Sequence, residues 1–232
     1  MIAKIFALIA FRDEEQHLPG LLSHLRDYVD GFVGFDDCSL DHSAKIARGE
    51  PKMLEVLQRK TPSADHRFEI ENRRDLLKTA TKKGADWVLC CDADERFETR
   101  LLEDLRKLIA EPPAEVLGLP LVAVWENFHQ HRVGKAKKFV LFRSEDPDPY
   151  YCPGSLHQQW FPPRYYSRSQ QLLDYYIYHL GSITRADRLA RYEKFNRIDP
   201  DKRHQPLGYE NIIDETNVIL NEIKPERSFK YA

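Results

Sequence analysis

The chain has 232 residues, with 35 lysines and arginines against 37 aspartates and glutamates and a formal net charge of −2. This balance leaves no overall basic field of the kind that draws a protein to nucleic acid or anionic lipid. The apolar run at residues 5–11 is too short to span a bilayer, and no signal-peptide cleavage pattern follows it. We therefore expect a soluble cytoplasmic protein with no integral membrane segment. None of the four cysteines has the CxxC spacing of a zinc site, and no disulfide framework is indicated.

The first half alternates strand-like and helix-like segments, a pattern typical of a mostly parallel sheet covered by helices. Apolar runs predict strands, and leucines at helical spacing, as at positions 18, 21, 22 and 25, predict helices. Asp13 is the expected cap of the first helix, and Gly31 and Gly84 are expected to end helices. The predicted elements are a strand over 4–11, a helix over 18–25, strands over 32–35 and 53–57, a helix over 69–83 and a strand over 87–91.

The second half is less regular. We predict a helix over 100–110 and strands over 116–124 and 138–142, after which the sheet is expected to end. Prolines among tyrosines over 146–166 favour an ordered loop. Two helices are expected over 185–197 and 209–223. The chain thus divides into a core at 1–145 and a loop with C-terminal helices at 146–232, packed on that core.

Acidic residues follow two of the predicted strands. Asp36 and Asp37 come directly after the second strand, and Asp92 and Asp94 come directly after the fourth. Because loops converge beyond the carboxyl ends of parallel strands, we expect these four carboxylates to meet at one edge of the sheet. Oxygen ligands of this kind suit Mg²⁺ or Mn²⁺, which can neutralise a diphosphate and stabilise it as a leaving group.

Basic residues are placed to meet such an anion. Arg12 follows the first strand. Arg73 and Arg74 lie on the helix that precedes the DADE segment, residues 92–95. Arginine forks bind phosphate or carboxylate with two hydrogen bonds.

Three stretches of the sequence resemble the signature segments of family 2 glycosyltransferases, in order and in spacing: IFALIAFRDEE, VDGFVGFDDCSLD and ADWVLCCDADE. The likeness covers residues 1–145, and the later pieces FVLFRS, SLHQ and YIYHLGS are fainter matches. It implies an α/β fold of the GT-A class, a nucleotide-sugar-binding, Rossmann-like mixed sheet flanked by helices, here with a helical C-terminal extension. It also implies inverting transfer of a sugar from a nucleoside-diphosphate sugar to an acceptor hydroxyl, with Mn²⁺ or Mg²⁺.

The resemblance assigns roles to individual residues. Asp37 or Asp36 would contact the nucleotide base, Asp92 the ribose or the metal, and Asp94 the metal and the diphosphate. The implied nucleotide contacts are Arg12, Glu14, Asp36, Asp37, Arg73 and Asp92, and the implied metal ligands are Asp92, Asp94 and His179. Arg74 stands where the family usually has asparagine, so that contact is in doubt.

The general base is the least determined role. Related small enzymes commonly carry His-Glu where this chain has His157 and Gln158, and glutamine cannot accept a proton as a base. The remaining candidates are His157, Glu126 and Glu95.

Structural alternatives stay open for several of these residues. Asp36 and Asp37 can form only a turn and a helix cap. Glu95 can cap the next helix, and His157 and His179 can be packed structural histidines. Lys138 is most simply part of a solvated strand edge, although a lid over a diphosphate would also need lysines.

Two rival functions remain. A nucleotidyltransferase on a similar sheet would normally carry a glycine-rich loop after its first strand, which FRDEEQHLPG does not provide. A non-catalytic nucleotide-binding or scaffold protein is kept open by Gln158. By family analogy the partners are a nucleotide-sugar donor and a glycan or glycolipid acceptor of surface-glycan or lipopolysaccharide synthesis, reached at the inner face of the membrane.

Overall fold

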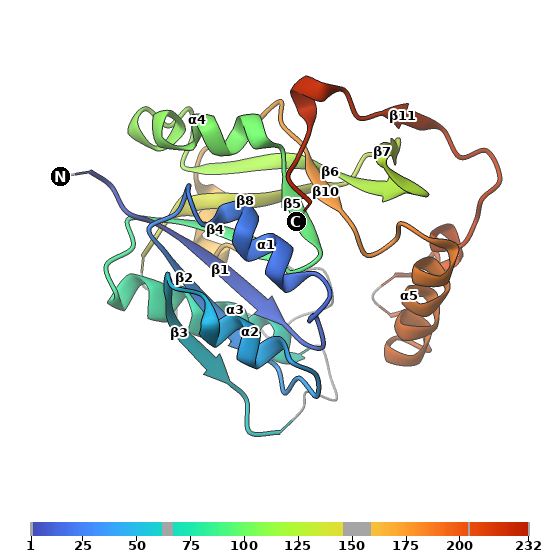
Figure 1. The fold of residues 1–232 in the computed structure, drawn as a ribbon, viewed down its shortest axis with the longest axis horizontal. Helices are drawn as coiled ribbons and strands as arrows, with labels where there is room; N and C mark the ends of the chain where they lie inside the picture. The colour runs from blue at the N-terminus through green and yellow to red at the C-terminus, as the bar shows by residue number, and fades with distance from the viewer. Residues whose placement is uncertain (1, 62–66, 146–158, 204, 232) are drawn as a thin grey trace.

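A computed structural model describes residues 2–61, 67–145, 159–203 and 205–231 of the chain. Its centre is a mixed sheet with helices on both faces (Figure 1). The parallel part comprises β1 (Ile5–Phe11), β2 (Gly31–Asp36), β3 (Met53–Gln58) and β4 (Trp87–Asp92), in the order β3-β2-β1-β4. These strands confirm the four predicted from the sequence, within two residues at each end.

Alternate residues of β1 pack into two separate cores, as the two-residue repeat of a strand requires. Ile5, Ala7 and Ile9 face α1 (Leu18–Leu25) and α4 (Thr99–Ala110), whereas Phe6 and Leu8 face α3 (Arg67–Lys82). The short helix α2 (Ser43–Gly49) lies on the α1 side, where Ala47 joins the first core. Because both faces are covered, β1 reads as a continuous apolar run.

Antiparallel strands extend the sheet beyond β4. β8 (Lys137–Arg143) pairs with β4, β6 (Val116–Trp125) pairs with β8, and β7 (Asn127–Arg132) pairs with β6. The prediction that the sheet ends at residue 142 is wrong. Three later strands join it, β9 (Gln170–Leu172), β10 (Ile177–His179) and β11 (Leu220–Glu222).

The strand β10 has a special place in this arrangement. It pairs parallel with β6 and antiparallel with β5 (Glu95–Phe97), the short strand that follows the DADE turn. All three residues of β10 are buried. A three-residue strand is too short to show a periodic pattern, so the sequence could not reveal it.

Other predicted boundaries are also corrected. Gly31 begins β2 instead of ending the first helix, and His17, not Asp13, occupies the N-cap position of α1. The helix α5 (Arg185–Ile198) confirms the prediction for 185–197 and begins with a capping box between Thr184 and Asp187.

The predicted helix over 209–223 is wrong. That segment holds a 3-10 turn at Glu210–Ile212 and the strand β11, separated by a turn in which Asp214 accepts hydrogen bonds from Thr216 and Asn217 has a φ of 57°. Polar turn residues outweigh the apolar spacing here, because their side chains satisfy the local backbone. Further 3-10 turns lie at Pro163–Ser167 and Pro225–Arg227. Across the described parts of the chain, no helix has the length and apolar character needed to cross a membrane.

Candidate active site

The parallel strands bring the predicted acidic and basic residues to one edge of the sheet. Phe11, at the end of β1, is in register with Asp36, and Ala10 is in register with Asp92. Arg12, Asp37 and the DADE turn therefore all follow strands that end at the same edge. This placement agrees with the prediction made from the strand order alone.

Asp36 and Asp37 differ sharply in their surroundings. Asp36 is fully buried, and its carboxylate accepts hydrogen bonds from the Ser39 backbone at 2.8 Å and from the Gln58 side chain at 3.0 Å. Asp37 remains partly accessible, with its carboxylate 3.3 Å from Nε of Arg59. Asp36 thus closes the turn after β2, and Asp37 is the carboxylate of the pair that can meet a ligand.

The first carboxylate of the DADE turn is paired with a lysine. Lys138 Nζ lies 2.7 Å from Asp92 Oδ2 and 2.7 Å from both oxygens of Glu95. Burial raises the pKa of Asp92, but Lys138 and Arg73 outweigh it and the net pKa is lowered. Glu95 is only 1% exposed and also accepts the Asp92 backbone N–H at 2.9 Å. Glu95 and Lys138 therefore stabilise the turn at residues 92–95 from its buried side. The Asp92 side chain remains 41% exposed.

The second carboxylate, Asp94, faces residues from the C-terminal half of the chain. Its Oδ2 lies 3.1 Å from His179 Nε2 and 3.8 Å from Arg191 Nη1. Its backbone carbonyl accepts a hydrogen bond from the Leu180 N–H at 2.7 Å. Burial raises the pKa of Asp94, but His179 and Arg191 outweigh this effect and hold that pKa far below its usual range. Pairing of β5 with β10 creates these contacts, because it sets His179 opposite Glu95.

Glu14 adds a third acid to this edge. Its backbone carbonyl accepts hydrogen bonds from the His17 and Leu18 N–H groups at the start of α1, and its side chain is half-buried. Burial, followed by the negative charges of Asp94 and Asp92, raises the pKa of Glu14 to about 8, against a smaller opposing effect of Lys194. Glu14 therefore holds its proton at a higher pH than an ordinary glutamate.

The predicted arginines divide between the site and the surface. Arg73 is 5% exposed, lies on the sheet side of α3, and its guanidinium stacks 4.6 Å from the Trp160 ring. Arg74 points away and pairs with Asp75 at the surface, so it does not replace the asparagine of the resemblance. Arg12 is 40% exposed and lies 3.8 Å from Asp13.

The three candidates for the general base have different outcomes. His157, with Gln158, falls outside the described residues. Glu95 is buried and held by Lys138, away from solvent. Glu126 lies just past the end of β6 with 55% of its side chain exposed, and it pairs with Arg188 at 2.8 Å. The strands β6 and β10 are parallel, and past their ends the Glu126 N–H donates to the Ile183 carbonyl while the Leu180 N–H donates to the Asp94 carbonyl. Glu126 therefore lies past the same strand ends as Asp94.

Sequence reasoning missed three cations of this site: Lys138, Arg191 and Lys194. The prediction of a solvated strand edge at Lys138 is wrong, because its ammonium pairs with the buried Glu95 and with the partly exposed Asp92. No local pattern distinguishes Lys138 from its exposed neighbour Lys137. Only the pairing of β8 with β4 makes the distinction.

The residues at the edge suit a divalent cation in one specific way. Within the described ranges, no three His, Cys, Asp or Glu side chains are grouped as a metal ligand set. Mg²⁺, however, is commonly held by one or two carboxylates together with phosphate oxygens and waters. Asp94 and Asp92 are carboxylates of this type, and both side chains lie at the edge where the parallel strand β4 ends.

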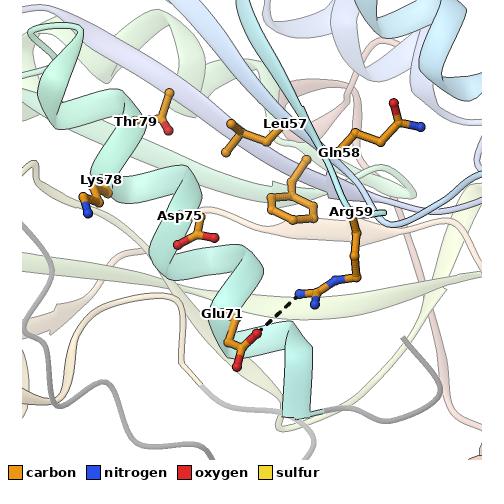
Figure 2. A pocket seen from close by; sticks show the side chains of 8 residues that line it. Leu57, Gln58, Arg59, Glu71, Asp75, Lys78 and Thr79 are labelled. Carbon is orange, nitrogen blue, oxygen red and sulfur yellow. Dashed lines mark ion pairs between the residues drawn. The ribbon is translucent and has the colours of Figure 1, made fainter. Parts of the chain in front are cut away.

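A cavity of about 370 Å³ lies beside this edge, between β3 and α3 (Figure 2). Phe35 and Leu57 form its apolar part, and charged side chains of α3 line the other side. Arg59 links the cavity to the acidic edge, since it lies 3.7 Å from Glu71 and 3.3 Å from Asp37. The DADE turn does not line this cavity.

The chain resembles several known proteins in sequence or in fold, but no protein-family model matches it. It is 26% identical over 219 residues to the uncharacterized protein Rv3786c of Mycobacterium tuberculosis, covering 86% of this chain and 52% of that protein. A TPR repeat-containing protein of Synechococcus elongatus is 28% identical over 148 residues, covering 63% of this chain and 33% of that protein. The chain thus spans about half the length, or less, of these curated relatives.

Among solved structures, S. aureus TarS superposes with a TM-score of 0.57 at 21% identity, covering 91% of this chain and 42% of TarS. The TarS 1-349 structure in complex with UDP-GlcNAc gives a TM-score of 0.53 at 19% identity, covering 91% of this chain and 71% of that one. At these identities the likeness concerns the backbone arrangement. Together with the mixed sheet and its flanking helices, it shows that this chain has the GT-A fold.

Proposed function

We propose that this chain is an inverting glycosyltransferase that moves a sugar from a nucleoside-diphosphate sugar to an acceptor hydroxyl with the help of a divalent cation. The observation that carries the proposal is the acidic edge itself. Asp92 and Asp94 stand where the parallel strands end, and Lys138, His179 and Arg191 reach them from separate elements. Carboxylates with basic side chains beside them suit a metal-bound diphosphate, because the carboxylates can bind the cation and the basic side chains can bind the phosphate oxygens.

The fold supports the same proposal. TarS has been solved with UDP and with UDP-GlcNAc, and its backbone matches 90% or more of this chain. We bring that ligand class to this chain as a hypothesis, since a shared fold does not by itself define an activity.

Each residue of the edge has a proposed role. Asp37 contacts the nucleotide base, while Asp36 holds the turn that presents it. Asp92 binds the ribose or the cation, and Asp94 binds the cation. Arg12 and Arg73 contact the nucleotide phosphates, and Glu14 lies beside them. The divalent cation would stabilise the negative charge of the departing diphosphate.

We assign the acceptor side to the C-terminal residues 146–232 and the general base to Glu126. Its carboxylate is the one among the described candidates that is both exposed and at the right edge. The proposed acceptor is a glycan or a glycolipid, reached by a cytoplasmic enzyme working at the inner face of the membrane.

A binding experiment tests the donor class. Purified protein is titrated by calorimetry with UDP, GDP, CDP and dTDP, with and without Mn²⁺. We expect one diphosphate to bind in a Mn²⁺-dependent way, and Asp94→Asn to weaken that binding by at least about tenfold, or ~1.4 kcal/mol.

Asp27→Asn is the matched control, because Asp27 is an exposed aspartate on the far side of α1 from the edge. It should bind like the wild type. If none of the four diphosphates binds, either with or without Mn²⁺, the DADE segment is only a turn and the proposal is wrong. Binding without any sugar transfer would favour a nucleotide-binding protein without catalysis.

A further inference from the structure

The helix α5 places one basic side chain, Arg191, against the acidic edge from the C-terminal half of the chain, and a second positive charge, Lys194, one turn further on. Arg191 Nη1 lies 3.8 Å from Asp94 Oδ2 and 2.5 Å from His179 Nε2. Lys194, three residues further along the same face of α5, acts on Glu14, whose carboxyl pKa its charge lowers. None of these contacts was predicted from the sequence.

The anchoring of α5 explains why its charges reach the edge. Arg188, 1% exposed, stacks 3.8 Å from the Trp125 ring, donates hydrogen bonds to the Ser182 and Ile183 carbonyls, and pairs with Glu126 and Glu215 at 2.8 Å. Figure 1 shows α5 set apart from the helices that cover the sheet. One buried arginine therefore holds the base of α5 while the rest of the helix extends beside the site.

The contact between Asp94 and α5 competes with a metal ion. His179 and Arg191 both approach Oδ2, the same oxygen of Asp94. A divalent cation bound to that oxygen would lie within a few ångströms of the guanidinium and would repel it. Gly181 packs closely against this group, since a Cβ added there would meet Asp94 Oδ2 at 2.3 Å and Arg191 Nη1 at 3.3 Å. A cation that takes Oδ2 would therefore compete with Arg191 for the same carboxylate oxygen.

We propose that Arg191 exchanges partners when the donor binds. Without ligand it neutralises Asp94; when a divalent cation takes Asp94, the guanidinium turns to the phosphate oxygens of the donor diphosphate, with Lys194 supplying a second positive charge. Arg191 can make this change because 31% of its side chain is exposed, and its fork of donors fits phosphate oxygens as well as carboxylate oxygens. The inference rests on the proposed function and adds two residues that contact the donor diphosphate.

The exchange predicts that Arg191→Gln binds Mn²⁺ more tightly but UDP more weakly than the wild type. Arg191→Gln removes a cation that competes with the metal, so Mn²⁺ alone should bind about fivefold more tightly than to the wild type. The same variant loses a phosphate contact, so UDP at saturating Mn²⁺ should bind about tenfold more weakly. Lys194→Gln should weaken UDP binding and leave the Mn²⁺ affinity close to that of the wild type. General damage to the fold would lower both affinities and cannot produce the crossed pattern.

The experiment is two calorimetric titrations, Mn²⁺ alone and then UDP with Mn²⁺ present, on the wild type, both variants and Arg197→Gln. Arg197 is an exposed arginine further along α5, so its substitution removes the same charge without touching the edge. It should match the wild type in both titrations.

The outcomes separate this inference from the proposed function. If the wild type binds UDP with Mn²⁺ but Arg191→Gln behaves like it, or loses both affinities together, the exchange is wrong and the transferase proposal stands. If the wild type binds neither ligand, both are wrong. Arg191→Lys keeps the charge but not the fork, and it should restore the wild-type Mn²⁺ affinity while UDP binding stays weakened.

Discussion

Glu14 is a half-buried acid whose charge opposes folding. Its pKa is raised from 4.5 to about 8, first by burial and then by Asp94 and Asp92. The folded state therefore holds a proton that the unfolded chain has lost between these two pH values, and stability falls as the pH rises through this window. This loss would be relieved by a divalent cation, which neutralises the neighbouring carboxylates.

Glu14→Gln should remove this pH dependence, because the amide carries no charge at any pH. We expect the variant to equal the wild type near pH 4 and to exceed its free energy of unfolding near pH 9, without metal, by between about 2 kcal/mol and the roughly 5 kcal/mol that the full shift would give. Urea denaturation across that range measures the difference. Glu15→Gln is the control of opposite sign, since backbone and side-chain hydrogen bonds from His42 lower the pKa of Glu15. If the difference in the free energy of unfolding between Glu14→Gln and the wild type does not change with pH, the pKa of Glu14 is not raised in the folded protein.

Glu126 shares a partner with a second carboxylate, which provides an internal comparison for the general base. Both Glu126 and Glu215 lie 2.8 Å from Arg188 Nη2. Glu126→Gln and Glu215→Gln each remove one ion pair from the same guanidinium. If Glu126 is the base, its variant should lose about 10²–10⁴-fold in the rate of sugar transfer and keep the wild-type affinity for UDP, whereas Glu215→Gln should keep most of its rate. Equal losses in the two variants would mean that Glu126 only supports Arg188.

At the scale of elements, the pairing of β8 with β4 brings Lys138 beneath the DADE turn. Lys138→Met would leave Glu95 buried without its cation, and Asp92 without its partner. Because removing one member of a buried ion pair strands the other, we expect a loss of about 3 kcal/mol in the free energy of unfolding, most of it from Glu95. Chemical denaturation near neutral pH measures it.

Lys137→Met is the neighbouring control, since Lys137 is exposed, and a change within about 0.5 kcal/mol is expected there. Adding Glu95→Gln to Lys138→Met should recover part of the loss, because the stranded charge is then removed. If the double variant is no more stable than Lys138→Met, the ion pair does not account for the effect.

At the scale of the whole molecule, the C-terminal residues supply part of both cores. Leu173 and Ile177 belong to the core on the α1 side, and Trp160, Phe161 and Tyr165 to the core on the α3 side. The chain then returns to α1, where Lys230 donates a hydrogen bond to Ser23 at 3.0 Å. The division of the chain at residue 145 stays a prediction, and these contacts argue that the first part depends on the second.

A protein ending at residue 145 should therefore fail to fold by itself, whereas the full chain should unfold in one cooperative transition. Without residues 159–179, the apolar side chains that these residues cover are exposed and β5 and β6 lose a partner strand. Circular dichroism melting and size-exclusion chromatography of the two proteins measure the difference. A cooperative melt of residues 1–145 alone would establish that part as an independent domain.

The sequence by itself determined the parallel half of the fold and the position of its acids. Apolar runs and helical leucine spacing are local patterns, so β1 to β4 and the helices between them could be predicted, and the carboxyl ends of parallel strands necessarily share an edge. The order of the strands alone therefore predicts that Asp37, Asp92 and Asp94 lie at the same edge of the sheet.

Only the tertiary structure decided which cations meet those acids. Lys138 is 46 residues from Asp92 and Arg188 is 62 residues from Glu126, and both contacts depend on pairings between strands or helices distant in the chain. The three-residue strands β5 and β10 carry no periodic signal, yet their pairing sets His179 beside Asp94. Nor could the spacing of apolar residues show that Leu220–Glu222 form the strand β11, because that strand depends on β7 as a partner. Contacts of this kind are decided by packing and electrostatics across the folded molecule, which no window of local sequence contains.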